Sequence, residues 1–96
     1  MQIQNRRYQK DPNIVSRKIA KEVILVPIRN RIGDLENIYT LNEVAARIWE
    51  LIDGKKNVSQ IIDTIIDEFD VSAEEAEQDL SEFIQKLEKI EGIRPT

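Results

Sequence analysis

Three stretches in the first part of the chain have the pattern of short β-strands. The first, Ile14–Ile19, is rich in β-branched residues, and the second, residues 22–28, is a largely apolar run. A third stretch of the same kind, residues 36–41, follows a polar loop over residues 29–35. Because the three are consecutive and closely spaced, we predict that they form an antiparallel meander.

Beyond residue 41 the spacing of the apolar residues changes to that of helices. Three runs with apolar residues three and four positions apart each follow a residue that commonly caps a helix N-terminus, namely Asn42, Asn57 and Ser72. After the second and third caps, a Gln or a Glu three positions on gives the pattern of a capping box. Gly54 and Gly92 follow the first and third runs, and we expect them to end those helices.

This order of elements predicts the fold class. Strands followed by helices indicate an α+β domain, in which three helices pack on one face of a three-stranded antiparallel sheet. We expect a single domain over residues 13–93, preceded by an N-terminal tail, residues 1–12, whose pairing the pattern leaves open. Trp49 lies on the apolar side of the first helix, in line with Ala45 and Ile52, and is expected in the core.

The composition argues against several classes of function. The 96 residues include no Cys and no His, which removes the thiolates that hold iron–sulfur clusters and the most common general base and metal ligand. The acidic clusters lack the spacing of a calcium-binding loop and lie near helix ends, which favours a structural role. We therefore expect no enzyme activity, no catalytic residue, no metal site and no cofactor.

Neither a membrane span nor a signal peptide is predicted. No apolar run reaches the about 18 residues that a membrane-spanning helix needs. Residues 1–10 are polar and lack the apolar centre of a signal peptide. The sequence therefore predicts a cytoplasmic protein.

Charge is divided unevenly along the chain. Residues 1–33 carry eight Lys or Arg and two acids, a net charge of +6, whereas residues 34–96 carry six basic and sixteen acidic residues, a net charge of −10. This division is compatible with charged partners, with self-association and with two ordinary solvated surfaces, and all three stay open at this point.

Two of the predicted elements make a candidate binding site. In a meander, residues 36–41 form an edge strand with no Lys or Pro to protect it, and such an edge is a template for an added strand. The third helix carries a net charge of −5 over residues 72–91. Its flank carries Asp79, Glu82, Phe83 and Lys86. A helix beside an open edge forms a groove, unless the N-terminal tail, another helix or a second chain covers the edge.

The central part of the chain resembles a known family. Residues 38–54, IYTLNEVAARIWELIDG, resemble the signature of the pyrroloquinoline quinone biosynthesis protein D (PqqD) family, which has Leu-Asn, a small residue, a large apolar residue or Trp, and then Asp-Gly. Residues 58–71 are similar to the second helix and following turn of that family, residues 75–87 to its third helix, and Gly92-Ile93 to its ending. In order and spacing, the resemblance covers residues 13–93.

The resemblance implies a three-strand, three-helix domain of winged-helix type that recognises ribosomally made and post-translationally modified peptides (RiPPs). Such domains bind the leader of a precursor peptide and deliver it to a partner, commonly a radical S-adenosylmethionine (SAM) enzyme or another peptide-modifying enzyme. The family has branches outside quinone biosynthesis. The leader adds as a strand beside the third strand and against the third helix. By position, the implied peptide-binding residues are Asn37, Ile38, Tyr39, Thr40, Leu41, Asp79, Phe83, Lys86 and Leu87.

Two other classes share parts of this pattern. A winged-helix DNA-binding protein has the same elements, but its recognition helix must be basic to neutralise phosphates. The acidic third helix opposes that function, although the basic N-terminal third keeps it as the alternative. A dimerisation domain, in which the edge strand pairs with its own copy, is a third class. We expect a peptide partner, no nucleic acid and no membrane, with a homodimer left open.

Overall fold

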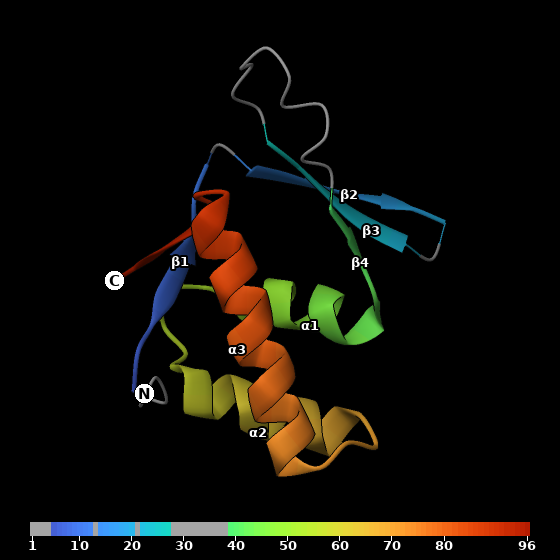
Figure 1. The fold of residues 1–96 in the computed structure, drawn as a ribbon, viewed down its shortest axis with the longest axis vertical. Helices are drawn as coiled ribbons and strands as arrows, with labels where there is room; N and C mark the ends of the chain where they lie inside the picture. The colour runs from blue at the N-terminus through green and yellow to red at the C-terminus, as the bar shows by residue number, and fades with distance from the viewer. Residues whose placement is uncertain (1–4, 13, 21, 28–38) are drawn as a thin grey trace.

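A computed structural model describes residues 5–12, 14–20, 22–27 and 39–96 of the chain (Figure 1). The helices are α1 (Glu43–Leu51), α2 (Val58–Glu68) and α3 (Ala73–Lys89). The strands are β1 (Tyr8–Lys10), β2 (Ile14–Ile19), β3 (Glu22–Pro27), β4 (Tyr39–Leu41) and β5 (Ile93–Pro95). The architecture is α+β, as the sequence predicts. No helix in the described ranges is both long enough and apolar enough to cross a membrane.

Strands β2, β3 and β4 form the predicted antiparallel meander. The sheet has the order β2-β3-β4, so that β2 and β4 are its edges. Leu25 of β3 is opposite Tyr39, and Val23 is opposite Leu41, across the β3–β4 pair. Because side chains alternate between the faces of a strand, Val23, Leu25 and Leu41 share the face that packs on the helices. The sequence-predicted third strand begins at residue 36, and its first three residues lie outside the described ones.

The predicted N-caps hold the start of each helix. Asn42, Asn57 and Ser72 each accept a hydrogen bond from the backbone N–H three residues on, at 2.8, 2.9 and 3.1 Å. Gln60 completes the capping box at Asn57, since its side chain accepts from the Asn57 N–H at 2.8 Å. At the third helix, the Glu75 carboxylate accepts from the hydroxyl of Ser72 at 3.3 Å. These bonds satisfy N–H groups that have no partner within the helix itself.

Gly92 takes part in ending α3, but it is not the residue in the left-handed conformation. Helix α3 ends at Lys89, and the residue in the left-handed conformation is Glu91, with a φ of 56°. The N–H of Gly92 donates to the carbonyl of Leu87 at 2.7 Å. A Cβ at Gly92 would lie 3.3 Å from Cγ1 of Ile14. Glycine is therefore favoured here by the close approach of strand β2, whereas Gly54 does adopt the left-handed conformation, with a φ of 79°.

A second, two-stranded sheet joins the two ends of the described chain. Strand β1 pairs antiparallel with β5, with Tyr8 opposite Pro95 and Lys10 opposite Ile93. On its other side, the carbonyl of Tyr8 accepts from the N–H of Gly54 at 2.8 Å, in the connection between α1 and α2. Part of the segment that the sequence treats as a tail is thus a strand held from two sides.

One hydrophobic core joins both sheets and the three helices. The most deeply buried side chains come from β3 and from every helix, and the largest are Leu25, Ile48, Ile52, Ile65, Leu80 and Leu87. Trp49 is only 4% exposed, which confirms that it belongs to the core. The ammonium of Lys10 lies 5.2 Å from the centre of the Trp49 ring, a cation–π distance that links β1 to α1.

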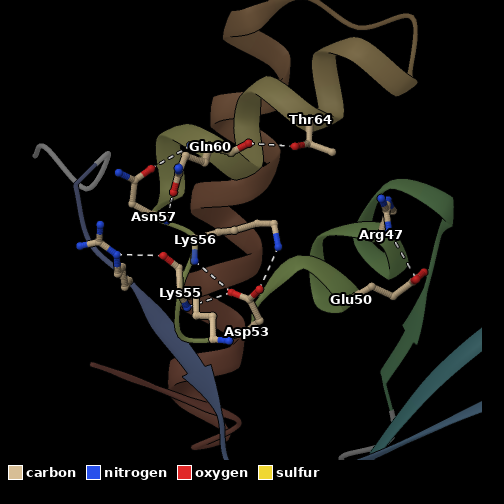
Figure 2. A network of polar contacts seen from close by, with 9 residues as sticks. Arg47, Glu50, Asp53, Lys55, Lys56, Asn57, Gln60 and Thr64 are labelled. Atoms are coloured by element: carbon tan, nitrogen blue, oxygen red, sulfur yellow. Dashed lines mark hydrogen bonds and ion pairs between the residues drawn. The ribbon is translucent and has the colours of Figure 1, made fainter.

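Arg47 of α1 makes polar contacts on the surface with Glu68 of α2 and with Glu50 of its own helix, and Figure 2 shows the contact with Glu50. Two nitrogens of Arg47 donate to the two carboxylate oxygens of Glu68, at 2.8 and 2.9 Å. Arg47 also reaches Glu50, at 3.5 Å. The hydrogen bonds from Arg47 lower the pKa of Glu68 below its usual value. This two-bond geometry adds orientation as well as attraction, because both carboxylate oxygens are engaged.

The Asp53 carboxylate holds the turn between α1 and α2. It accepts from the backbone N–H groups of Lys55 and Lys56, both at 2.9 Å, and from Nζ of Lys56 at 2.8 Å (Figure 2). The side chain of Lys56 first, and then the two backbone donors, hold the pKa of Asp53 well below its usual range. The turn is therefore tightest while this carboxylate is ionised.

We predict that Trp49→Ala strongly destabilises the protein. Removing the buried indole leaves a cavity, which costs about 3–5 kcal/mol in the free energy of unfolding for a large aromatic side chain. Urea unfolding followed by far-UV circular dichroism measures this loss. A variant as stable as the wild type would show that the core does not depend on Trp49.

We also predict that Asp53 contributes to a loss of stability in acid. Its pKa is lower in the folded state than in the unfolded chain, so its contribution is complete above about pH 4, the unfolded value, and is lost as the pH falls further. Urea midpoints at pH 7 and pH 3 should therefore differ less for Asp53→Asn than for the wild type. Asp63→Asn, at an exposed position of α2, is the matched control and should behave as wild type. Parallel curves for Asp53→Asn and wild type would contradict the prediction.

Candidate functional site

A groove of about 210 Å³ lies between the edge strand β4 and helix α3. The first two turns of α1 close it at the bottom, because α1 begins directly after β4. The lining residues are Leu25, Tyr39, Thr40, Leu41, Asn42, Val44, Ala45, Ile48, Asp79, Glu82, Phe83, Lys86, Leu87 and Ile90. The groove is thus formed by β3, β4, α1 and α3, and these four elements belong to the same hydrophobic core.

The floor of the groove is apolar and rigidly supported. Leu25, Leu41, Ile48 and Leu87 are buried in the core and also line the groove, and Phe83 is 9% exposed. Side chains packed on all other sides hold their positions, so the groove is formed without a ligand. An apolar floor of this kind accommodates a hydrophobic side chain and excludes water from it.

The rim along α3 is charged. Asp79, Glu82 and Lys86 are exposed and line the groove on its solvent side. On a helix of 3.6 residues per turn, these positions lie on one flank, beside the apolar stripe that includes Phe83 and Leu87. Glu82 accepts a hydrogen bond from Gln78 at 3.3 Å. Within the described residues, neither Asp79 nor Lys86 forms an ion pair.

The rim along β4 is a strand edge. One side of Tyr39–Leu41 pairs with β3, and among the described residues no strand pairs with the other side. Thr40 is exposed, and Tyr39 is half-buried. Main-chain groups on such an edge hydrogen-bond to water until another strand takes its place. The site therefore combines directional main-chain bonds, an apolar floor and charged side chains.

The structure brings together most of the residues that the sequence predicts for the site. Tyr39, Thr40, Leu41, Asp79, Phe83, Lys86 and Leu87 all line this one groove. Asn37 and Ile38 lie outside the described residues. Phe83 and Leu87 are buried in the core and also form part of the floor of the groove. Their binding role stays a prediction.

Sequence reasoning missed the contribution of α1. Val44, Ala45 and Ile48 line the groove beside the N-cap residue Asn42. A signal for this was present, because the Asn42 cap starts α1 at the end of β4 and its apolar stripe must then begin beside that strand. The described residues hold no cluster of three or more His, Cys, Asp or Glu that could bind a metal ion. The arrangement is that of a binding groove.

Comparisons with known proteins point to one family. The family model described as "Coenzyme PQQ synthesis protein D (PqqD)" matches residues 22–91. A solved structure, "TbiB1 in Complex with the TbiA(beta) Leader Peptide", is similar with a TM-score of 0.72 and 28% sequence identity. The similarity covers 90% of this chain and 94% of the TbiB1 chain. No curated protein matches this chain.

Proposed function

Because this chain belongs to the PqqD family, we propose that it is a non-catalytic RiPP recognition module, which binds the leader of a ribosomally made precursor peptide. The observation that carries the proposal is the groove between β4 and α3, which has the form that an added strand requires. The similarity to TbiB1, whose structure is a complex with a leader peptide, supports the same function.

Approximate free energies indicate how much the strand edge and the apolar floor each contribute to binding. A few main-chain hydrogen bonds to Tyr39–Leu41, at a net ~0.5–1.5 kcal/mol each, do not overcome the ~4–15 kcal/mol cost of association and ordering. Apolar side chains on the floor supply the rest, since burying about 300–500 Å² at ~25 cal/mol/Å² contributes roughly 8–12 kcal/mol. We therefore expect dissociation constants near micromolar, which correspond to a binding free energy of about −8 kcal/mol.

The chemistry of modification belongs to a separate protein in this proposal. The chain has no Cys, so it lacks the thiolates that hold the iron–sulfur cluster of a radical enzyme. We propose that the module delivers its peptide to a radical SAM enzyme or another peptide-modifying enzyme, in the cytoplasm. Holding the leader raises the local concentration of the precursor near that enzyme without any reaction on this chain.

A titration of leader peptide into isotope-labelled protein tests the site. With the synthetic leader of a candidate precursor peptide, we expect the largest backbone amide shifts in residues 39–41 and in the groove side of α3. Helix α2 does not line the groove and is the internal control. Largest shifts in α2, with β4 and α3 unchanged, would show that the groove is the wrong site.

Strand addition also predicts a periodic response in the peptide. Consecutive residues of a strand direct their N–H groups to opposite sides, so only alternate N–H groups of the leader can bond to β4. A series of leaders, each with one backbone N-methyl group, should lose affinity at every second position within the bound segment. Equal losses at consecutive positions would exclude pairing with the edge.

The absence of catalysis is tested by intact mass. After incubation of the purified protein with the precursor, we expect the mass of the precursor to be unchanged, because the module only binds it. Addition of the partner enzyme and its cofactors should then produce the modified peptide. A mass change with this protein alone would refute a purely binding function.

A further inference from the structure

The charges on the rim of the groove are ordered along α3. The acids Asp79 and Glu82 lie toward its N-terminal end, and Lys86 lies toward its C-terminal end. Since a helix rises 1.5 Å per residue, Asp79 and Lys86 are about 10 Å apart along the axis. All three side chains are exposed, and within the described residues Asp79 and Lys86 form no ion pair. The groove therefore presents opposite charges at its two ends.

The sheet favours one direction of an added strand relative to these charges. Every pair in the β2-β3-β4 sheet is antiparallel, and an antiparallel addition to β4 is the slightly more stable arrangement. In Figure 1, β4 descends toward α1 whereas α3 rises from the level of α2 toward the level of the sheet. A peptide antiparallel to β4 therefore runs in the same sense as α3, with its N-terminal part near Asp79 and its C-terminal part near Lys86.

The rim from Asp79 to Lys86 is comparable in length to a five-residue segment of strand. Residues two positions apart in a strand face the same side and lie about 7 Å apart, and residues four positions apart lie about 13 Å apart. Three alternate residues of a peptide thus span the rim from Asp79 to Lys86, with the middle one above the floor at Phe83 and Leu87. Long charged side chains at the outer two positions reach the rim.

On the basis of the proposed function, we propose that the groove selects peptides by the order of their charges. The preferred segment has a basic residue, an apolar residue and an acidic residue at alternate positions, in that order from its N-terminus. Asp79 and Glu82 receive the basic side chain, and Lys86 receives the acidic one. These exposed pairs add specificity to an affinity that comes mainly from the apolar floor.

Three synthetic nine-residue peptides test the proposal. The first has Lys-Thr-Leu-Thr-Glu at its centre, the second has the reversed order Glu-Thr-Leu-Thr-Lys, and the third is neutral, with Gln at both charged positions. All have blocked termini and the same flanking Ser and Thr residues. By fluorescence anisotropy at about 20 mM salt, we expect the first to bind about five- to tenfold more tightly than the second. At 1 M salt the difference should fall below about twofold, because the Debye length is then about 3 Å.

Exchanging the rim charges should reverse the preference. The double variant Asp79→Lys/Lys86→Glu keeps the net charge and exchanges the basic and acidic positions along α3. It should therefore favour the second peptide. The matched control, Gln85→Lys/Lys89→Gln, also keeps the net charge and moves a lysine between positions of α3 that do not line the groove. It should keep the preference of the wild type. Circular dichroism verifies that both variants fold.

The outcomes separate this proposal from the function on which it rests. Binding of all three peptides with equal affinity would refute selection by charge order and leave the peptide-binding function intact. A preference that persists in the double variant would refute the assignment to Asp79 and Lys86. No binding of any of the three at 1 mM would refute the proposal too, and the leader titration then decides separately whether the groove binds peptides.

Discussion

Burial of one face of α3 is the interaction on which the other features of the domain depend. Helix α3 buries a stripe that contacts α1, α2 and β5 and closes the core that these elements share with the three-stranded sheet, and its members are Ala76, Leu80, Phe83, Ile84 and Leu87. A sheet of three short strands cannot cover its apolar face alone, and two short helices cannot form a closed core. The long third helix supplies the missing surface to both. Its position is therefore set by the whole core.

The groove is a consequence of this packing. Helix α3 lies beside the β4 edge of the sheet and bounds the position that a fourth strand would fill. The residues that line the floor, such as Leu25, Ile48 and Leu87, are among the most deeply buried in the protein. Their packing is needed for stability whether or not a ligand is present. A site built from core residues is pre-formed, which reduces the entropy lost on binding.

The sequence predicts local features of this fold well, because each depends on neighbouring residues. The three N-caps and the strand meander follow from short patterns that act within a few positions. The groove is predicted because a helix beside an open strand edge forms one, and the resemblance to the PqqD family implies the same location. The assignment of Asp79 and Lys86 to its rim follows from their place beside the apolar stripe of α3.

Features that depend on distant parts of the chain are the ones that sequence reasoning misses. Strands β1 and β5 have three residues each, too few to show an alternating pattern, and each needs the other as a partner. The position of Gly92 suggests a helix end, whereas its contact with Ile14 comes from the opposite end of the chain. The apolar residues of α1 are predicted as core, and only the assembled structure shows that they also line the groove.

The pairing of β1 with β5 also has a consequence for the order of folding. It closes a loop that spans nearly the whole chain. The loss of chain entropy is therefore larger than for the hairpin of β2 and β3, whose strands are adjacent. We expect contacts of that range to form late, after the helices and the meander have drawn the ends together. Once formed, the pair is held by more than its own hydrogen bonds, because Tyr8 and Ile93 are buried in the core and the carbonyl of Tyr8 also accepts from Gly54. Because Tyr8 and Ile93 belong to the core that also forms the floor of the groove, joining the two ends of the chain supports the packing on which the groove depends.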